Sequence, residues 1–366
     1  MTGPAGVEAY AVAPPGLEDV LADELRGLGL PGVRPEEGGV AFSGSREDLW
    51  RANLESAVAG RVLVRLARFR ARTPARAARE LGRVRWGEWL PPGARLEVRV
   101  ARHRSRLHTG ALAEAVREAA ARALGPPGAG PPFSVRVRVV ADEVVMSLDT
   151  SGDHLHRRGY RLDPGAAPLR ENLAAGLLRA AGWNGTEPLL DPMAGSGTLP
   201  IEAARLALGI PPGWQRAFAF ERFANHDPAR WDALRSERLS RIRRDLPAPV
   251  FAADRSAAAL RRLRDAARRA GVADHLQVAE ADLEWLFPPA PTGILVADPP
   301  HGRRLGGSDA ALGALAAALT GPFRRWRWAI LTPDPARLAA EGLRPRGIRW
   351  VRHGGRRLAW VTGGPG

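Results

Sequence analysis

Short apolar runs alternate with amphipathic segments through the first part of the chain. Residues 16–30 (GLEDVLADELRGLGL) repeat Leu and Val at helical spacing, with acids near their start, and predict a helix. Residues 38–44 predict a short strand, and Ser45 is placed to cap a second helix over 45–54. Residues 61–71 alternate basic and apolar positions as a half-buried strand does. Two helices interleaved with strands indicate a ferredoxin-like unit.

A second unit follows with the same mixture of strands and helices. Residues 96–109 predict a strand that runs into a basic loop, and 111–124 predict a helix. Residues 133–152 alternate on both sides of 141–143, which is the pattern of a β-hairpin. A connector begins at 156, and a helix is expected from about 168.

From residue 187 the pattern changes to strand, glycine turn and helix, repeated several times. This order predicts an open, mostly parallel sheet with helices on both faces. An aromatic insertion, about 209–249, interrupts the first crossover and is expected to serve packing. The fold class is therefore α/β throughout, divided into units 1–65, 66–155, 156–183 and 184–366.

The composition shows a strong net positive charge and excludes every function that requires cysteine. The chain has 366 residues, a net charge of +15 and no cysteine, which excludes disulfides, thiol nucleophiles and cysteine zinc sites. Strong positive charge favours a polyanionic partner such as nucleic acid. All the basic residues are Arg, however, which a GC-rich genome also produces, so the charge needs support from motifs. No apolar run is long enough to span a bilayer, and we expect a cytoplasmic protein.

The loop DPMAGSGT (191–198) has the composition of a ligand site. It follows an apolar strand and precedes a helix, and Gly195 and Gly197 allow a tight turn and a close approach of backbone to ligand. A NAD or phosphate site is the competing interpretation. The absence of lysine excludes a phosphate-binding GK[ST] loop. The acid Asp191 suits the ammonium group of an amino-acid-bearing cofactor better than a pyrophosphate.

Further acids follow the next strands. Asp254 ends the strand VFAAD, where such folds place a carboxylate against ribose hydroxyls, and Asp282 follows another strand, where it would meet an adenine amine. The strand ILVA ends in Asp298, Pro299 and Pro300. Prolines cannot donate, so this loop offers acceptors only. Those acceptors can bind both N–H groups of a delocalised aryl amine and favour its reactive form, because positive charge develops there.

These motifs resemble the THUMP-domain RNA methyltransferases, most closely the branch that methylates the guanine 2-amino group of 23S ribosomal RNA. The similarity runs nearly end to end: DPMAGSGTLPIEAA and the pair LHRRGYR and APLRENLAA are specific, and the N-terminal match is looser. It implies a ferredoxin-like unit, a THUMP domain and a Rossmann-like domain that binds S-adenosylmethionine. It also implies a monomer without a metal.

The resemblance also implies roles for individual residues. The cofactor-binding positions would be Arg170, Asn172, Asp191, Pro192, Ala194, Gly195, Ser196, Gly197, Asp254, Asp282 and Leu283. The target amine would be held by Asp298, Pro299 and Pro300, next to His301. The family usually has an aromatic residue, most often Tyr, where this chain has His301. That departure concerns how strongly the extruded base is stacked, and therefore substrate preference or activity.

Arginine-rich segments are the candidates for phosphate contact. Flipping the target base or presenting it in a loop costs free energy, and contacts between protein and RNA must offset that cost. The predicted RNA-contacting residues are Arg102, Arg104, Arg106, His108, Arg157 and Arg158.

Several functions remain open on the sequence. The first expectation is guanine-N2 methylation of 23S ribosomal RNA, and a tRNA guanine-N2 methyltransferase of the same architecture is the nearest alternative. An adenine-N6 methylase is another, since the Asp-Pro-Pro loop serves exocyclic amines in general. A catalytically inactive RNA-binding or ribosome-assembly factor is the alternative outside the enzymes.

Overall fold

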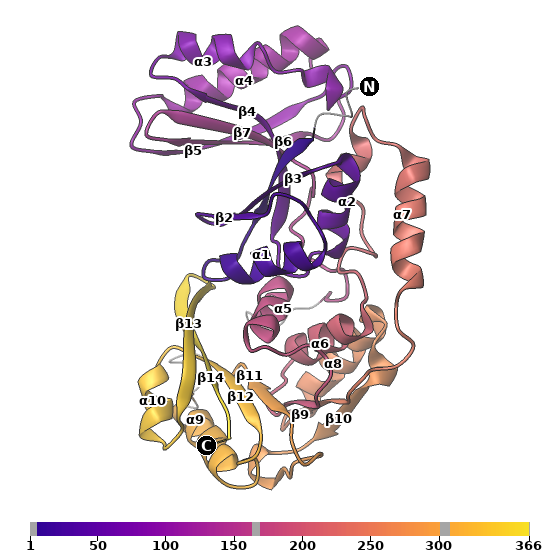
Figure 1. The fold of residues 1–366 in the computed structure, drawn as a ribbon, viewed down its shortest axis with the longest axis vertical. Coiled ribbons are helices and arrows are strands. Elements are labelled where there is room, and N and C mark those ends of the chain that lie inside the picture. The colour runs from indigo at the N-terminus through magenta and orange to yellow at the C-terminus, as the bar shows by residue number, and fades with distance from the viewer. Residues whose placement is uncertain (1–5, 163–168, 301–307, 366) are drawn as a thin grey trace.

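A computed structural model describes residues 6–162, 169–300 and 308–365. Its N-terminal and C-terminal parts each contain one seven-stranded sheet, and Figure 1 shows them at opposite ends of an elongated molecule, with α5 (Glu171–Ala180) between them. Among the described residues, every helix is too short or too polar to cross a lipid bilayer. The predicted α/β fold class is confirmed in both parts.

The N-terminal sheet has the strand order β2-β3-β1-β4-β7-β6-β5, and only β5 and β6 run parallel. Its strands are β1 (Val7–Val12), β2 (Arg34–Glu36), β3 (Gly39–Gly44), β4 (Arg61–Arg70), β5 (Leu96–His103), β6 (Phe133–Val140) and β7 (Glu143–Asp149). Strand β4 pairs with both β1 and β7 and runs through the predicted division at residue 65, so the two N-terminal units share one continuous sheet.

Four helices pack against this sheet: α1 (Glu18–Gly27), α2 (Arg46–Glu55), α3 (Pro74–Leu81) and α4 (Thr109–Leu124), with a 3₁₀ turn η1 (Trp86–Glu88). Ser45 caps α2 as predicted, in a capping box with Asp48. The hairpin turn between β6 and β7 lies at Ala141 and Asp142, both with positive φ, as a tight two-residue turn requires.

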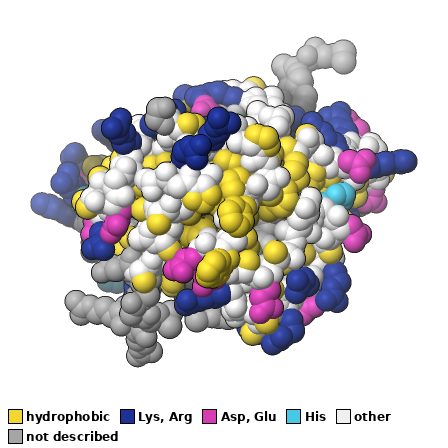
Figure 2. Space-filling view, turned by 90° about the horizontal axis from the view of Figure 1, so that it is seen from below, with side chains coloured by type: hydrophobic (Ala, Val, Ile, Leu, Met, Phe, Trp, Pro, Cys, Tyr) yellow, Lys and Arg dark blue, Asp and Glu magenta, His cyan; other side chains and the backbone are white. Residues whose placement is uncertain are grey.

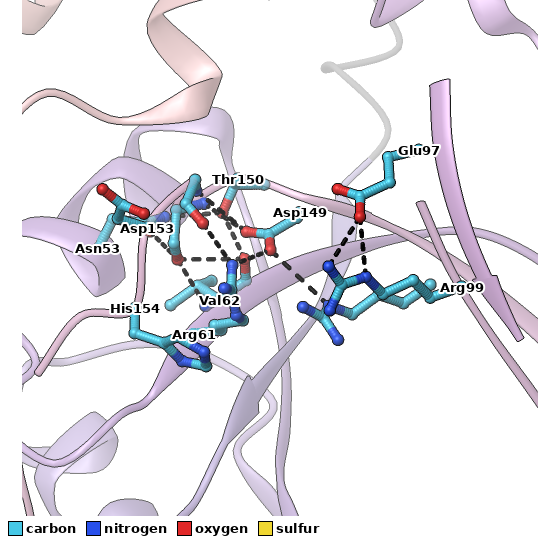
Figure 3. Close-up of polar contacts among 12 residues, drawn as sticks. Asn53, Arg61, Val62, Glu97, Arg99, Asp149, Thr150, Asp153 and His154 are labelled. Atoms are coloured by element: carbon cyan, nitrogen blue, oxygen red, sulfur yellow. Dashed lines mark hydrogen bonds and ion pairs between the residues drawn. The ribbon is translucent and has the colours of Figure 1, made fainter. Parts of the chain in front are cut away.

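A buried polar cluster fixes the end of β7 to α2 and β4 (Figure 3). Asp149 is fully buried and pairs with Arg61, while Asn53 donates to the Thr150 hydroxyl over 2.8 Å. Burial raises the pKa of Asp149, although the Arg61 guanidinium acts in the opposite direction. The charges of Asp149 and Arg61 compensate each other only when the chain is folded. The cluster therefore holds the chain in position where it leaves the N-terminal sheet.

The C-terminal sheet has the order β10-β9-β8-β11-β12-β14-β13. Its strands are β8 (Leu189–Asp191), β9 (Val250–Asp254), β10 (Leu276–Glu280), β11 (Ile294–Ala297), β12 (Arg327–Thr332), β13 (Pro345–His353) and β14 (Arg356–Gly363). The first five in spatial order are parallel, and β14 and β13 are antiparallel additions at one edge. Strand order reverses between β8 and β11, which is where ligands bind in such sheets.

Helices cover both faces of this sheet, as predicted. The remaining elements are α6 (Thr198–Leu208), α7 (Pro228–Ser240), α8 (Ala257–Ala270), α9 (Ser308–Thr320), α10 (Pro335–Ala340), η2 (Ala219–Arg222), η3 (Ala273–His275) and η4 (Leu283–Trp285). Helices α6 and α8 belong to a core that continues into the N-terminal half, whereas α9 and α10 cover a separate apolar cluster on the other face.

The aromatic insertion packs, as predicted, and its partner is the N-terminal half. Trp50 of α2 meets Phe220 and Trp231 with ring centroids 5.8 and 6.1 Å apart, and Phe133 of β6 meets Phe223 at 5.9 Å. The insertion therefore holds the two halves together along one side of the molecule (Figure 1). The far end of the C-terminal part shows apolar side chains at its centre and arginines around its margin (Figure 2).

Candidate active site

The glycine loop after β8 is shaped by two different glycines. Gly195 has φ +55°, and a Cβ built on it meets no atom within 4 Å. Gly197 has φ +85°, and its Cβ would lie 2.5 Å from Cγ of Leu263 on α8. Gly195 thus leaves open space for a ligand beside the backbone, whereas Gly197 lets α6 pack closely on α8. The sequence predicted a close approach to ligand at both positions, and the structure distinguishes them.

The acid at the end of β9 closes this loop. Asp254 accepts a hydrogen bond from the Gly195 backbone N–H over 2.8 Å, and the Ala194 N–H donates to the Ala253 carbonyl over 2.9 Å. The second Asp254 oxygen accepts from the Ser256 N–H at the start of α8. Asp254 is only partly buried, and its two oxygens order the loop and the start of α8.

Asp191 lies at the centre of an acidic group. It is buried, and its Oδ1 accepts from the Met193 N–H over 3.1 Å. Burial raises the pKa of Asp191 well above its ordinary value, and the nearby carboxylates of Asp298 and Asp254 raise it further. The three acids are therefore close enough to influence one another electrostatically, at the ends of the adjacent strands β9, β8 and β11. Such a group binds a cation most favourably, because a positive charge compensates the repulsion among the acids.

The neighbouring predicted residues frame the same edge. Pro192, Ala194 and Gly197 are buried, and Ser196 is partly buried. Asp282 is exposed and caps η4, while the next residue, Leu283, is buried. Pro299 is buried, Pro300 is exposed, and the Asp298 side chain is partly buried. His301 lies outside the described residues.

Helix α5 contributes the other predicted cofactor residues. Arg170 is exposed at the helix N-cap, and Asn172 is buried. The Asn172 amide donates to the Val58 carbonyl in the N-terminal half over 3.1 Å, but its buried Oδ1 has no partner in the described part of the chain. A buried acceptor without a donor is costly, so this oxygen is suited to a ligand N–H or O–H.

The predicted RNA contacts divide into exposed and buried residues. Arg102, Arg104, Arg106, His108 and Arg157 are exposed, as phosphate contact requires, and their role stays a prediction. The prediction for Arg158 is wrong, because its side chain is only 1% exposed.

Arg158 instead belongs to a network that the sequence did not predict. It donates to the carbonyls of Ala57 and Leu155 and lies 3.6 Å from Glu202 of α6. Tyr160 also donates to Glu202, over 3.0 Å, and Arg161 donates to the Thr198 hydroxyl at the start of α6. The available signal was Glu202, an acid that stands with Arg205 in the otherwise apolar run IEAARLAL. This network joins the N-terminal half to the helix that follows the glycine loop.

Comparison with known proteins agrees with this architecture. Residues 158–331 match a family model described as "RMKL-like, methyltransferase domain", and residues 8–63 match one described as "RlmL ferredoxin-like domain". The chain is 31% identical over 360 residues to "Putative RNA methyltransferase slr0064" of Synechocystis, covering 94% of each protein. It is 36% identical over 342 residues to "Ribosomal RNA large subunit methyltransferase K/L" of Methylococcus capsulatus, covering 88% of this chain and 46% of that protein.

The chain thus spans about half the length of the K/L relatives it matches. Among solved structures it resembles "SMU.472, a putative methyltransferase complexed with SAH", with a TM-score of 0.91, 28% identity and coverage of 100% of this chain and 99% of that one. A structure described as a predicted N6-adenine-specific DNA methylase from Listeria monocytogenes gives the same TM-score and identity, with 98% and 97% coverage. The glycine loop, the three acids and these matches place the chain in the RlmKL-like methyltransferase family.

Proposed function

We propose that this protein transfers the methyl group of S-adenosylmethionine to the 2-amino group of a guanosine in RNA, and that the RNA is 23S ribosomal RNA. The observation that carries the proposal is that Asp191, Asp254 and Asp298 follow adjacent strands and interact electrostatically where the strand order reverses. The names of the K/L relatives support a large-subunit ribosomal RNA substrate. The similarity to a methyltransferase structure complexed with SAH supports the cofactor.

The residues of the site fit this cofactor. Its ammonium and sulfonium groups are cations, and the three neighbouring acids can supply the compensating negative charge, because a bound cation favours the ionised form of the buried Asp191. The open space beside Gly195 admits a ligand against the backbone, and Asn172 offers an unused buried acceptor. When bound, S-adenosylmethionine supplies an electrophilic methyl group.

The chain's own groups would then prepare the nucleophile. Asp298 stands after β11, between the cofactor-side strands β8 and β9 and the opposite strands of the sheet. Its carboxylate and a loop carbonyl would accept the two N–H groups of the guanine amine, which concentrates the nitrogen lone pair for attack on the methyl carbon. The amine would become positively charged as it gains the methyl group and the methyl–sulfur bond of the cofactor breaks, and it would then release a proton to the Asp298 carboxylate. Pre-placed acceptors therefore stabilise the transition state more than the ground state.

The test is methyl transfer to defined RNA classes. The purified protein would be incubated with methyl-labelled S-adenosylmethionine and, separately, deproteinised ribosomal and transfer RNA from a deletion strain. We expect label in N2-methylguanosine from ribosomal RNA, and loss of at least about a hundredfold in rate for Asp298→Ala, by analogy with removal of a transition-state acceptor. The matched control is Asp245→Ala, an exposed acid of the insertion, which should retain full activity.

Each other result selects one alternative. Label in guanosine of transfer RNA would replace the substrate, and label in adenosine would replace the target base. No label in any RNA, with cofactor still bound, would contradict the proposal and favour an inactive RNA-binding protein.

A further inference from the structure

The antiparallel hairpin β13–β14 forms one lateral side of the C-terminal sheet, and this is the side from which the substrate must enter the site. The loops after β8 and β9, with Asp282 after β10, occupy one side of the site, and Asp298 follows the next strand, β11. Strands β12, β14 and β13 continue on the other side. The hairpin turn, Gly354 and Gly355, lies at the same carboxyl edge as Asp298, because β14 is antiparallel to β12. A nucleic acid that reaches Asp298 without displacing the cofactor has to approach over this half of the edge.

This hairpin concentrates positive charge. Residues 343–366 contain six arginines and no Asp or Glu. Arg352 and Arg357 stand opposite each other in the register and are both exposed. Such a segment attracts phosphates, because none of its own residues can compensate the charge.

The same surface carries exposed apolar groups. The side chains of Ile348 and Trp350 are 50% and 38% exposed. Together with Arg352 they occupy every second position of β13, so the three side chains share one face of the strand. The Arg357 guanidinium lies over the Trp350 ring, 4.1 Å from its centroid, which holds the ring in place.

The register shows which face this is. Trp350 stands opposite Ala359, and Ile348 opposite Val361. Ala359 and Val361 point into the apolar cluster under α9 and α10. The exposed aromatic face is therefore on the side of α9, the helix that follows the Asp-Pro-Pro loop in sequence.

The opposite side of the hairpin is anchored to the N-terminal half, as Figure 1 shows for β13 beside α1. Arg349 donates to the Gly16 carbonyl over 2.9 Å and to Asp19 over 2.6 Å. Gly16 has φ +93°, and a Cβ there would lie 2.0 Å from the Trp350 carbonyl oxygen. The hairpin is therefore fixed in position.

We propose that the outer face of this hairpin, made of Ile348, Trp350, Arg352 and Arg357, is a stacking platform for single-stranded RNA beside the target nucleotide. A base stacks on the part of the Trp350 ring that Arg357 leaves exposed, and the two arginines contact the adjoining phosphates. Aromatic rings interleaved with arginines are the combination that binds unpaired nucleotides. This inference rests on the proposed function for its substrate class.

The test measures the binding of a short, unstructured, fluorescein-labelled RNA through the fluorescence anisotropy of its label, with SAH present. Trp350→Ala should weaken binding about tenfold, and Trp350→Phe should keep most of the affinity, because a ring remains for stacking. Arg352→Glu should weaken binding and lower its dependence on salt. The matched controls are Phe287→Ala, which removes another exposed aromatic, and Arg325→Glu, at the opposite edge of the sheet. Both should bind as the unaltered protein does.

Folding is checked by the SAH affinity, which should stay unchanged in every variant. Unchanged RNA affinity in Trp350→Ala overturns the platform, as does an equal loss in Phe287→Ala. If Trp350→Ala weakens binding of a duplex of the same sequence as much as it weakens binding of the single strand, the assignment to single strands is overturned. Loss of self-association without loss of RNA binding would make the surface a protein interface and also overturn it. If RNA binding depends on Trp350 but no RNA is methylated, the proposed function fails and the platform stands. If RNA is methylated and Trp350→Ala leaves the KM for RNA unchanged, the proposed function stands and the platform fails.

Discussion

The glycine loop after β8 shows how two identical residues can serve different purposes. Both glycines have positive φ, so any side chain at either position is strained by about 1–2 kcal/mol. Their surroundings differ, since Gly195 faces open space and Gly197 faces Leu263. A sequence motif records the glycines but not what lies beside them. Substitution at each position should therefore affect a different property of the protein.

We predict that Gly197→Ala lowers stability by about 1–3 kcal/mol beyond the backbone strain, because its Cβ overpacks the contact with α8. Gly195→Ala should cost only the strain in stability but should weaken binding of S-adenosylmethionine. Urea unfolding without ligand and isothermal titration with cofactor measure the two effects. Equal losses of stability in both variants would contradict this division of roles.

At the scale of elements, the prediction from sequence succeeded where hydrophobic periodicity and turn residues agree. The helices after Leu17 and Ser45 and the hairpin turning at Ala141 all form as expected. The strand ends of the methyltransferase part could also be predicted, because the acids there follow short apolar runs. The hairpin β13–β14 was not predicted, since Arg occupies many of its positions and hides the alternation. Arg158 was misassigned because residue type does not reveal whether a side chain is buried.

The segment that leaves β7 carries a pair of histidines that should make stability depend on pH. Partial burial, together with the nearby Arg61, lowers the pKa of His154 to about 4, and partial burial, together with His154, lowers the pKa of His156 to about 3. His154 is drawn in Figure 3 beside Arg61. Both imidazoles stay neutral in the folded protein at pH values where those of the unfolded chain, with a pKa near 6.5, take up protons.

We therefore predict that stability falls as pH decreases from about 6.5 towards 4, with a contribution from this pair. His156→Gln should reduce the difference between the melting temperatures at pH 7.5 and pH 5. His103→Gln, at an exposed position on β5, should leave that difference as it is. A pH dependence that is identical in all three proteins would show that the pair does not contribute.

At the scale of the whole molecule, one apolar core crosses from the N-terminal sheet to α6 and α8. The network around Glu202 adds a polar connection, in which Glu202 of α6 is the acceptor for Tyr160 and lies beside Arg158. Burial raises the pKa of Tyr160 well above its ordinary value, and the Glu202 charge acts in the same direction. A molecule joined in this way should unfold as one unit.

Glu202→Ala tests this connection. It leaves the Arg158 guanidinium buried beside no acid of α6, and we predict a loss of about 3–5 kcal/mol in the free energy of unfolding. Glu202→Gln keeps an acceptor for Tyr160 and should lose less. Calorimetry should show a single transition for the unaltered protein. Two separate transitions in the unaltered protein would refute the shared core.

The insertion between α6 and β9 has a consequence for synthesis on the ribosome. Trp50 and Phe133 are made early, but the rings that cover them, from Phe220 to Trp231, follow much later in the chain. At ordinary translation speeds the delay after Trp50 is on the order of 10 s or more. The nascent N-terminal half therefore presents an uncovered aromatic surface for that time, and a holdase chaperone that binds aromatic segments would find its site there.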